Sequence, residues 1–370
     1  MQPKIITFYL PQFHAIPEND EWWGDGFTEW TNVKKSKPLY KGHYQPEIPL
    51  NNNYYCLLDS EAQEWQSKLA QKYGVYGFCY YHYWFNGKLL LQKPMENMLI
   101  NPKINIHFCI SWANESWSRT WTGKEKEVLI KQESDDEEMI KKHFEYLLPF
   151  FKDQRYIKID NKPLFIIYKP HLMPNVKREL EIWNELAINN GFDGIYFGHQ
   201  SCESFDYDMS MFDFGIEFEP FYTRAYESKS YKNFLKRMIH FICHPSQLFQ
   251  KIRNRLSLGW VDNYDRITKI ACNRNADNHS YLGAFPSWDN TPRKGKKSYI
   301  VKGSTPLKFE NYLTNLLKKN RAKDKNNDFI FINAWNEWAE GAHLEPSELY
   351  KFSYLEAVKN SLEKDKSYGE

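Results

Sequence analysis

Two glutamates near the C-terminus have the type and the spacing that acid–base chemistry requires. Glu337 and Glu340 lie in the segment Trp335–Gly341, which directly follows an apolar run. Two carboxylates three positions apart share one face of a helical turn. Held among tryptophans they repel each other, so one takes a raised pKa and acts as an acid at neutral pH. Cleavage of an acetal linkage needs such an acid and a second carboxylate on the other face of the sugar. The pair therefore predicts catalysis at a glycosidic bond; the alternative is a capped loop with two solvated glutamates.

Clusters of aromatic and polar side chains follow most of the other apolar runs. They include Glu21–Trp30, Tyr80–Gly87, Ser111–Trp121 and Trp288–Arg293. The apolar face of a pyranose stacks on an aromatic ring, while neighbouring polar groups bind its hydroxyls. We therefore predict one large polar cleft, with the sugar-binding residues Trp22, Trp23, Glu29, Trp30, Tyr81, His82, Trp84, Trp112, Asn114, Glu115, Trp117, Arg119, Glu217, Glu219, Trp288, Asp289, Arg293, Trp335 and Asn336. For Ser111–Trp121 the alternative is an aromatic loop packed on the rim of the fold, and His82 taken alone suggests a packing histidine.

The elements that must position these residues alternate between short apolar runs and helical patterns. Strands are predicted at Ile5–Tyr9, Val75–His82, Ile106–Ser111, Leu164–Tyr168, Ile195–Gly198, Phe214–Phe218, Leu282–Phe285 and Phe329–Asn333. Helices are predicted at Asp59–Tyr73, Glu137–Phe151, Val176–Asn190, Leu307–Lys319 and Lys351–Leu362. Strands that are apolar on both faces and alternate with helices are typical of a parallel sheet. About eight such units predict an α/β fold of the TIM-like (β/α)8 barrel type.

We expect a single catalytic domain, residues 1–370, with a helical insertion at about residues 223–270. The alternative fold is a doubly wound sheet, which would need a nucleotide-binding fingerprint. The nearest approach to that fingerprint is Gly24-Asp25-Gly26, which lacks the third glycine and follows no strand.

Composition excludes several classes of partner. The formal net charge is +2, so the global charge does not argue for nucleic acid. None of the cysteines has C-x-x-C spacing and no cluster has convincing ligand spacing, so we expect neither a metal nor another cofactor. The one D-x-D pattern, Asp206-Tyr207-Asp208, is permissive enough to arise by chance. No apolar stretch fits a signal peptide or a membrane span, and Cys79 and Cys109 suggest reduced core thiols, so we expect a cytoplasmic protein.

Four longer motifs resemble a known family. Phe8–His14, Gly26–Val33, Trp112–Glu115 and Trp335–Gly341 resemble the WbsX-type proteins, and the resemblance covers nearly the whole chain. These proteins are encoded with bacterial surface-polysaccharide genes and are usually described as glycosyltransferases. The resemblance implies glycosyl transfer in the assembly of O-antigen or capsule, with an oligosaccharide or polysaccharide, free or lipid-linked, as substrate.

The WbsX-type proteins are in turn similar to the endo-α-mannosidases of glycoside hydrolase family 99, which are (β/α)8 barrels. The link is the segment Asn336–Gly341. By this resemblance Glu337 acts as a base on the sugar 2-hydroxyl, giving an anhydro-sugar intermediate, and Glu340 is the general acid/base of a retaining reaction. The chain departs from the mannosidases at Ala339, where they usually carry His, which leaves the sugar and the linkage open.

Three functions follow from these patterns. The first is a retaining glycosyltransferase in which an acceptor hydroxyl replaces water in the second step. The second is an endo-acting glycoside hydrolase of the α-mannosidase kind, and the third is a non-catalytic carbohydrate-binding protein. The presence of both glutamates argues against the third.

The predicted insertion contains a basic segment at residues 229–256. Its apolar residues recur at helical spacing on both sides of Pro245, which predicts two short basic amphipathic helices. Such helices bind anionic membrane surfaces, which would place the protein at the inner face of the membrane. The alternative is a helical lid whose apolar face packs on the barrel and whose basic face is solvated.

Overall fold

The computed structural model describes residues 2–118, 128–132, 136–201, 209–230, 259–324, 326 and 328–367, with side chains described for all of these except 228–230. The structure therefore does not describe Arg119, Asp206 or Asp208. It also does not describe the side chains of the basic segment 229–256. Among the described residues, no helix combines the length and the apolar character needed to cross a bilayer.

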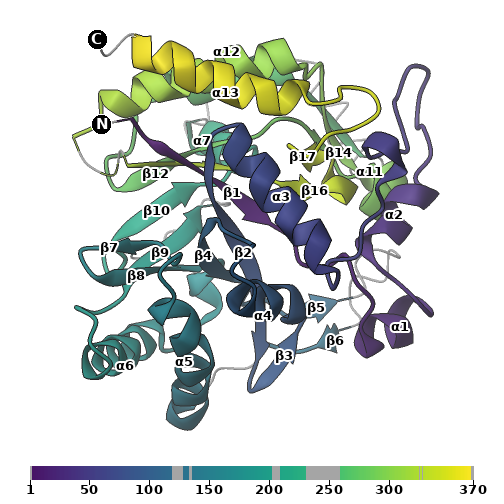
Figure 1. Ribbon diagram of the computed structural model, residues 1–370. Helices are drawn as coiled ribbons and strands as arrows, with labels where there is room; N and C mark the ends of the chain where they lie inside the picture. Colours follow the sequence, from purple (N-terminus) through teal and green to yellow (C-terminus); the bar gives the residue numbers. More distant parts are fainter. Residues whose placement is uncertain are drawn as a thin grey trace.

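Eight parallel strands close into a barrel (Figure 1). They are β1 (Lys4–Tyr9), β2 (Val75–Phe85), β4 (His107–Trp112), β8 (Lys162–Ile167), β9 (Tyr196–Ser201), β10 (Phe214–Glu217), β12 (Ser280–Ala284) and β15 (Phe329–Ile332). Each pairs with its neighbours in chain order. The ring closes where β15 pairs with β1, with Thr7 opposite Ile332. Every strand overlaps a predicted one, so the predicted barrel fold is confirmed.

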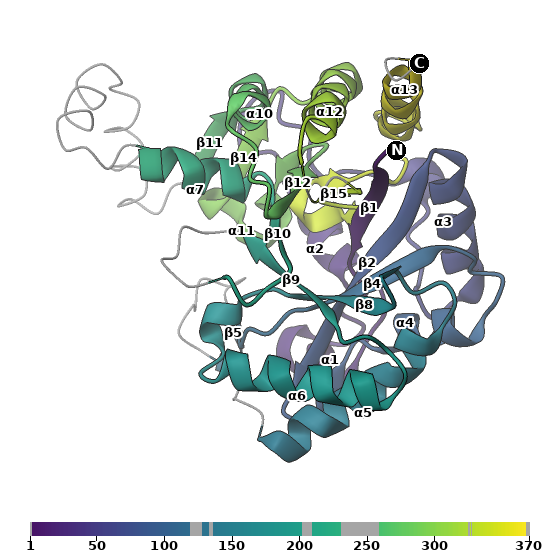
Figure 2. The ribbon, with the colours of Figure 1, turned by 90° about the vertical axis from the view of Figure 1, so that its left-hand side faces the viewer.

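Helices cover the outside of the barrel (Figures 1 and 2). The five predicted helices correspond to α3 (Ser60–Lys72), α5 (Glu137–Lys152), α6 (Val176–Asn189), α12 (Pro306–Arg321) and α13 (Ser353–Ser367). The sequence pattern does not predict α4 (Lys93–Ile100), which is short, or α10 (Tyr264–Asn273), which overlaps the end of the predicted insertion. Figure 2 shows α10 beside α12 on the outside of the barrel. The described part of the connection between β9 and β10 holds no helix.

The core consists of strands that are buried on both faces, as a barrel enclosed by helices requires. Strands β10, β12 and β15 are buried along their whole length. Aromatic rings fill much of this core; the Phe78 ring centroid lies 5.0 Å from that of Tyr9 and 5.1 Å from that of Trp335. Part of the high aromatic content is therefore structural.

Most of the remaining elements extend from the C-terminal ends of the strands, where barrel enzymes place their active sites. The connection after β1 contains α1 (Pro17–Trp23), α2 (Glu29–Lys35) and the 3-10 turn η1 (Leu50–Asn52). After β4 comes the pair β5 (Trp117–Ser118) and β6 (Val128–Ile130), and after β10 come α7 (Phe221–Ser230) and β11 (Trp260–Asn263). After β12 come β13 (Trp288–Asp289), α11 (Thr291–Lys294) and β14 (Tyr299–Lys302), and after β15 come β16 (Asn336–Glu337), η5 (Trp338–Glu340) and β17 (Ala342–His343).

Candidate active site

A cavity of about 370 Å³, the barrel cavity, opens at the C-terminal ends of the strands. Its walls come from segments far apart in the chain that the barrel brings together. The side chains used below are Gln12 after β1, Tyr81 and Tyr83 of β2, Glu115 and Trp117 after β4, Tyr168 after β8, Phe218 after β10, Trp288 and Arg293 after β12, and Glu337 and Glu340 after β15. The wall combines aromatic rings and polar groups, as the sequence predicts for a sugar site.

The centre of the barrel cavity is a guanidinium shared by three carboxylates. Arg293 donates through Nε to Glu29 Oε1 at 2.8 Å and through Nη2 to Glu337 Oε2 at 2.8 Å. Its Nη1 lies 2.6 Å from Glu340 Oε1. The Glu29 side chain is fully buried and that of Arg293 is 12% exposed. The two glutamates that the sequence predicts as a pair therefore meet on one cation.

Burial dominates the electrostatics of this cluster. Burial raises the pKa of Glu337 to about 8, and the negative charges of Glu340 and Glu29 add to this effect, while Arg293 opposes it. Burial also raises the pKa of Glu340, again against the effect of Arg293. For Arg293 burial opposes the charge, but the three carboxylates outweigh it and raise its pKa well above the usual value. With a pKa of about 8, Glu337 holds a proton at neutral pH, so the pair has an acid available.

The turn that carries the two glutamates is fixed by its own backbone and by Asn336. Residues of β16 and β17 pair in antiparallel fashion, with Glu337 opposite Ala342, and Gly341 between them has a φ of 57°, which favours glycine. The Asn336 side chain accepts a hydrogen bond from Leu10 N at 2.7 Å and donates one to Leu10 O at 3.0 Å. Asn336 therefore ties this turn to the end of β1 and positions Glu337 next to it; it does not line the cavity.

A buried carboxylate beneath the turn, Glu345, is the contact that sequence reasoning missed. Its Oε1 accepts hydrogen bonds from Gln66 Nε2 at 2.7 Å and Trp335 Nε1 at 2.9 Å. Its Oε2 accepts from Tyr55 Oη at 2.8 Å and Trp338 Nε1 at 2.6 Å. Both tryptophans that flank Glu337 are therefore held by one side chain, and Trp335 is a structural residue in the core and not part of the cavity wall.

Several predicted sugar-binding residues do line the barrel cavity. They are Trp23, Tyr81, Glu115, Trp117, Trp288 and Arg293. Glu29 reaches the site through Arg293. Trp22 lies just behind the wall, with its ring centroid 5.9 Å from that of Trp117. Trp30 packs under the site, 5.4 Å from Trp338.

Other predicted residues point to the outside of the barrel, because successive side chains of a strand face opposite sides. In β2, Tyr81 and Tyr83 face the cavity, while His82 and Trp84 contact His143 of α5. The Nε2 atoms of His82 and His143 are 2.9 Å apart. The Trp84 ring stacks on the His143 ring, with 4.5 Å between the ring centroids. Burial lowers the pKa of His82 to about 3, so it is neutral. The packing interpretation of His82 therefore matches its position.

The same alternation moves four more predicted residues off the cavity wall. At the end of β4, Ala113 and Glu115 face the cavity, while Trp112 packs against His143. The Asn114 amide donates a hydrogen bond to Lys169 O and accepts one from Lys169 N. At the end of β10, Phe218 faces the cavity, while Glu217 and Glu219 form buried ion pairs with Arg274, the residue that follows α10. These polar groups stabilise the packing of the barrel against its helices.

Asp289 also binds other side chains of the protein. It accepts hydrogen bonds from Gln45 Nε2 at 2.8 Å and Thr291 Oγ1 at 2.5 Å, and His43 Nε2 lies 2.6 Å from its carboxylate. Burial acts to raise the pKa of Asp289, but these hydrogen bonds outweigh it, so the pKa is lowered and the group is ionised. Asp289 thus holds the long connection after β1 against the segment that carries Arg293.

Gln12, Tyr83, Tyr168 and Phe218 line the cavity but were not predicted as sugar-binding residues. Gln12 is 3% exposed, and its Nε2 has no hydrogen-bond partner within the described ranges. Trp288 Nε1 is buried and unpartnered in the same sense. The four residues that were not predicted each lie in a predicted strand or within three positions of its end. Position at a strand end is therefore the signal that could have found them. The two donors, Gln12 Nε2 and Trp288 Nε1, are both buried, so a sugar hydroxyl would reach them only after a shift of the neighbouring side chains.

In the part of the chain that the structure describes, no three His, Cys, Asp or Glu side chains lie close enough together to hold a metal ion. Asp206 and Asp208 fall outside those residues, so the expectation of a metal-free reaction stays a prediction.

Comparison with known proteins identifies relatives over almost the whole chain. The uncharacterized protein WxcX of Xanthomonas campestris pv. campestris is 34% identical over 363 residues, which cover 97% of this chain and 49% of that protein. The chain thus spans about half the length of the curated relatives it matches. A solved GH99 endo-α-mannosidase from Bacteroides thetaiotaomicron superposes with a TM-score of 0.57 and 12% identity, covering 98% of this chain and 97% of that one.

A second solved structure, a glycoside hydrolase-like protein, superposes with a TM-score of 0.55 and 12% identity over 98% of this chain and 94% of its own. These structural similarities show the fold, in agreement with the closed barrel. A family model described as glycosyltransferase WbsX matches residues 5–358. The chain therefore belongs to the WbsX glycosyltransferase family.

Proposed function

We propose that the protein is a carbohydrate-active enzyme that acts at glycosidic bonds through Glu337 and Glu340. The observation that carries this proposal is the pairing of both carboxylates on Arg293 in an aromatic cavity at the C-terminal ends of the barrel strands. Membership of the WbsX family favours glycosyl transfer, in the assembly of a bacterial surface polysaccharide such as O-antigen or capsule.

For this pair we propose a retaining reaction in two steps, as the resemblance to the endo-α-mannosidases implies. In the first, Glu337 accepts the proton of the sugar 2-hydroxyl as that oxygen attacks C1, and Glu340 donates a proton to the leaving oxygen. An anhydro-sugar forms and the glycosidic bond breaks. In the second step an acceptor hydroxyl attacks C1, gives its proton to Glu340, and the 2-hydroxyl takes back its proton from Glu337. The cycle starts with Glu337 ionised and the proton on Glu340. Because burial favours the proton on Glu337, we propose that a bound sugar shifts it to Glu340 before the first step.

Arg293 has two consequences for this chemistry. Its charge stabilises an ionised carboxylate, so it limits how far burial raises the pKa of either glutamate. It also fixes both carboxylates at 2.6 to 2.8 Å from its nitrogens, which sets their separation before a sugar arrives. Trp23, Tyr81, Trp117 and Trp288 supply rings on which a sugar could stack around this centre.

An endo-acting glycoside hydrolase is the second candidate. The barrel superposes on an endo-α-mannosidase, and the same two steps with water as acceptor would hydrolyse a glycan. A carbohydrate-binding protein without catalysis is the third; the raised pKa of Glu337 argues against it, because a binding site needs no proton-sharing pair.

Product analysis decides between these functions. Purified protein is incubated with a panel of nucleotide sugars and glycan acceptors, and separately with α-mannan and bacterial surface polysaccharides, and the products are identified by mass spectrometry. Glycosyl transfer to an acceptor supports the first proposal. Chain shortening with no transfer would replace it by the hydrolase, and no change in any substrate would overturn both.

Peripheral contact with the cytoplasmic face of the inner membrane, through the basic segment 229–256, is a further part of the transferase proposal. It is motivated by the basic amphipathic pattern of that segment, because acceptors of polysaccharide assembly are often lipid-linked.

A further inference from the structure

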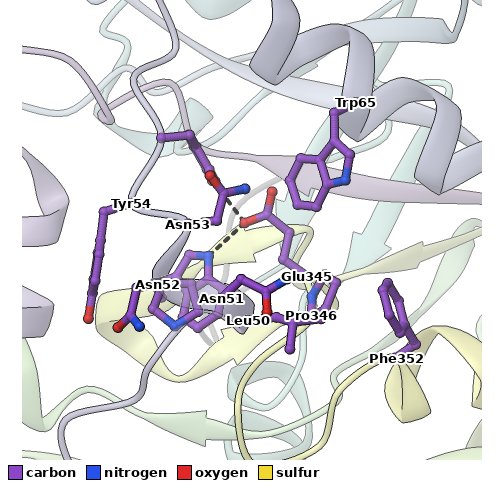
Figure 3. Close-up of a pocket in the computed structure, with 12 residues that line it drawn as sticks. Leu50, Asn51, Asn52, Asn53, Tyr54, Trp65, Glu345, Pro346 and Phe352 are labelled. Atoms are coloured by element: carbon purple, nitrogen blue, oxygen red, sulfur yellow. Dashed lines mark hydrogen bonds between the residues drawn. The ribbon is translucent and has the colours of Figure 1, made fainter.

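A second cavity, the outer cavity, lies on the other side of the turn that carries the two glutamates. It has a volume of about 530 Å³ and is lined by residues 49–55, Trp65 of α3, Trp338, Glu345, Pro346 and Phe352 (Figure 3). Figure 3 shows Trp65 and Phe352 on one side and Tyr54 on the other, with the Glu345 carboxylate between them. Glu337 and Glu340 line the barrel cavity and Trp338 lines the outer one, so a single turn separates the two.

The described wall of the outer cavity is aromatic and polar but carries no available charge. Tyr54, Trp65 and Phe352 are each partly exposed, so their rings offer surface to a ligand. Among the described lining residues Glu345 is the one carboxylate, and each of its oxygens already accepts two hydrogen bonds. The same lining residues include no lysine or arginine. Lys34 lies outside the lining, with its Nζ 4.0 Å from the Tyr54 ring centre.

Three consecutive exposed asparagines add hydrogen-bonding capacity to this wall. Across the described residues, the side-chain amides of Asn51, Asn52 and Asn53 have no protein partner. Each amide offers both donors and an acceptor. Aromatic faces next to amides match an uncharged pyranose, whose faces are apolar and whose rim carries hydroxyls.

The asparagines are held in place by the backbone beneath them. Leu50 N donates to Pro346 O at 2.9 Å and Glu348 N donates to Ile48 O at 2.8 Å, so this segment is bonded to the strand-like stretch after β17. Asn51 N also donates to the Glu348 carboxylate at 2.7 Å. Asn51 and Asn52 have φ values of 58° and 54°, a left-handed conformation that asparagine tolerates better than most residues. A wall fixed in this way loses little conformational entropy when a ligand binds.

We propose that the outer cavity is a second carbohydrate-binding site, which takes an uncharged segment of a glycan. The proposal rests on the proposed function for its ligand class, and it adds a binding site outside the barrel cavity. Phosphorylated or carboxylated ligands are disfavoured because the described wall holds no cation, and purely apolar ligands are disfavoured because they would desolvate three amides. Occupation of this site would hold a long glycan beside the catalytic turn, raising its local concentration.

Affinity electrophoresis in gels that contain yeast α-mannan, or dextran, tests this proposal. Both probes are uncharged polysaccharides, and Glu340→Gln serves as the background so that no probe is consumed. We expect the background protein to be retarded, and Trp65→Ala to weaken the affinity about tenfold or more through the lost stacking surface. Asn53→Ala should weaken it about threefold or more, and because its side chain is exposed and unpartnered among the described residues this variant should fold normally.

Two controls separate binding in the outer cavity from binding elsewhere on the protein. Asn105→Ala removes another exposed asparagine, at the N-terminal end of the barrel, and should leave the retardation unchanged. Trp117→Ala alters the barrel cavity and leaves the outer cavity unchanged. In a protein that carries Trp117→Ala, the further change Asn53→Ala should therefore still reduce the retardation. The proposal is overturned if neither polysaccharide retards the background protein, or if Trp65→Ala and Asn53→Ala migrate like Asn105→Ala. Failure of the proposed function would appear instead as absence of turnover in the wild type, which this binding assay does not measure.

Discussion

Replacement of Glu345 by glutamine should loosen the turn that carries the catalytic pair. The carboxylate accepts four hydrogen bonds, and two of the donors are the indole N–H groups of Trp335 and Trp338, one on each oxygen. In glutamine one of the two oxygens becomes an NH2 group. An indole can only donate, so in either orientation of the new amide one buried indole N–H faces another donor and has no acceptor.

The size of this effect can be worked from that single unpaired group. A buried donor left without an acceptor costs about 1–3 kcal/mol. Tyr55 can rotate its hydroxyl to accept from the new amide, so its loss adds little. If the same free energy is lost from the transition state through displacement of the turn, turnover falls about 5- to 150-fold. We expect the loss mainly in kcat, because Glu345 does not line the barrel cavity, where the reacting sugar would bind.

Urea unfolding followed by circular dichroism, together with steady-state kinetics on the substrate found by product analysis, measures both effects. Glu356→Gln is the matched control; it lies exposed on α13 and should change the free energy of unfolding by less than about 0.5 kcal/mol. A Glu345→Gln variant with the stability and the kcat of the wild type would refute the positioning role. A loss of stability with unchanged kcat would leave Glu345 as a packing residue only.

Three further outcomes are expected. Burial raises the pKa of Glu337 from 4.5 to about 8, so the stability linked to this group is present at low pH and is lost as the pH rises through that window. The difference in melting temperature between Glu337→Gln and the wild type should therefore shift in favour of the variant from pH 6 to pH 9. A shift in favour of the wild type would contradict this sign. Activity should be unchanged in EDTA; a loss restored by manganese or magnesium would point to Asp206 and Asp208 and to a nucleotide-sugar site. The protein should co-sediment with vesicles of anionic lipid at low salt and be released at high salt, since each basic residue near such a surface contributes about 1 kcal/mol; protein that stays in the supernatant at low salt would remove the membrane contact.

The barrel could be predicted because each strand is a short apolar run and most of the intervening helices are long and amphipathic. The cavity could be predicted in outline because chemistry in a barrel gathers at the strand ends, which is where Glu337, Trp117 and Trp288 lie. What the sequence does not show is the facing of each side chain. A strand buried on both sides has no polar face, so nothing in the pattern distinguishes Tyr81, which lines the cavity, from His82, which packs against α5.

Contacts between distant positions were also beyond the sequence. Glu29 and Arg293 are 264 positions apart, and only closure of the barrel brings them together. Glu345 carries no local signal, because its four donors come from the connection after β1, from α3 and from the two tryptophans of the turn. Glu217 and Glu219 matched the expected pattern of acids after a strand, but their partner Arg274 lies at the end of α10, outside the barrel.

Kinetics of Glu337→Gln and Glu340→Gln, beside wild type and Glu356→Gln, test the catalytic role of the pair most directly. Each single substitution should lower turnover about a hundredfold or more, as expected when a general acid or base is removed, with the circular dichroism spectrum unchanged. Glu356→Gln should keep the turnover of the wild type. Turnover like that of the wild type in either Glu337→Gln or Glu340→Gln would contradict the assignment of chemistry to this pair.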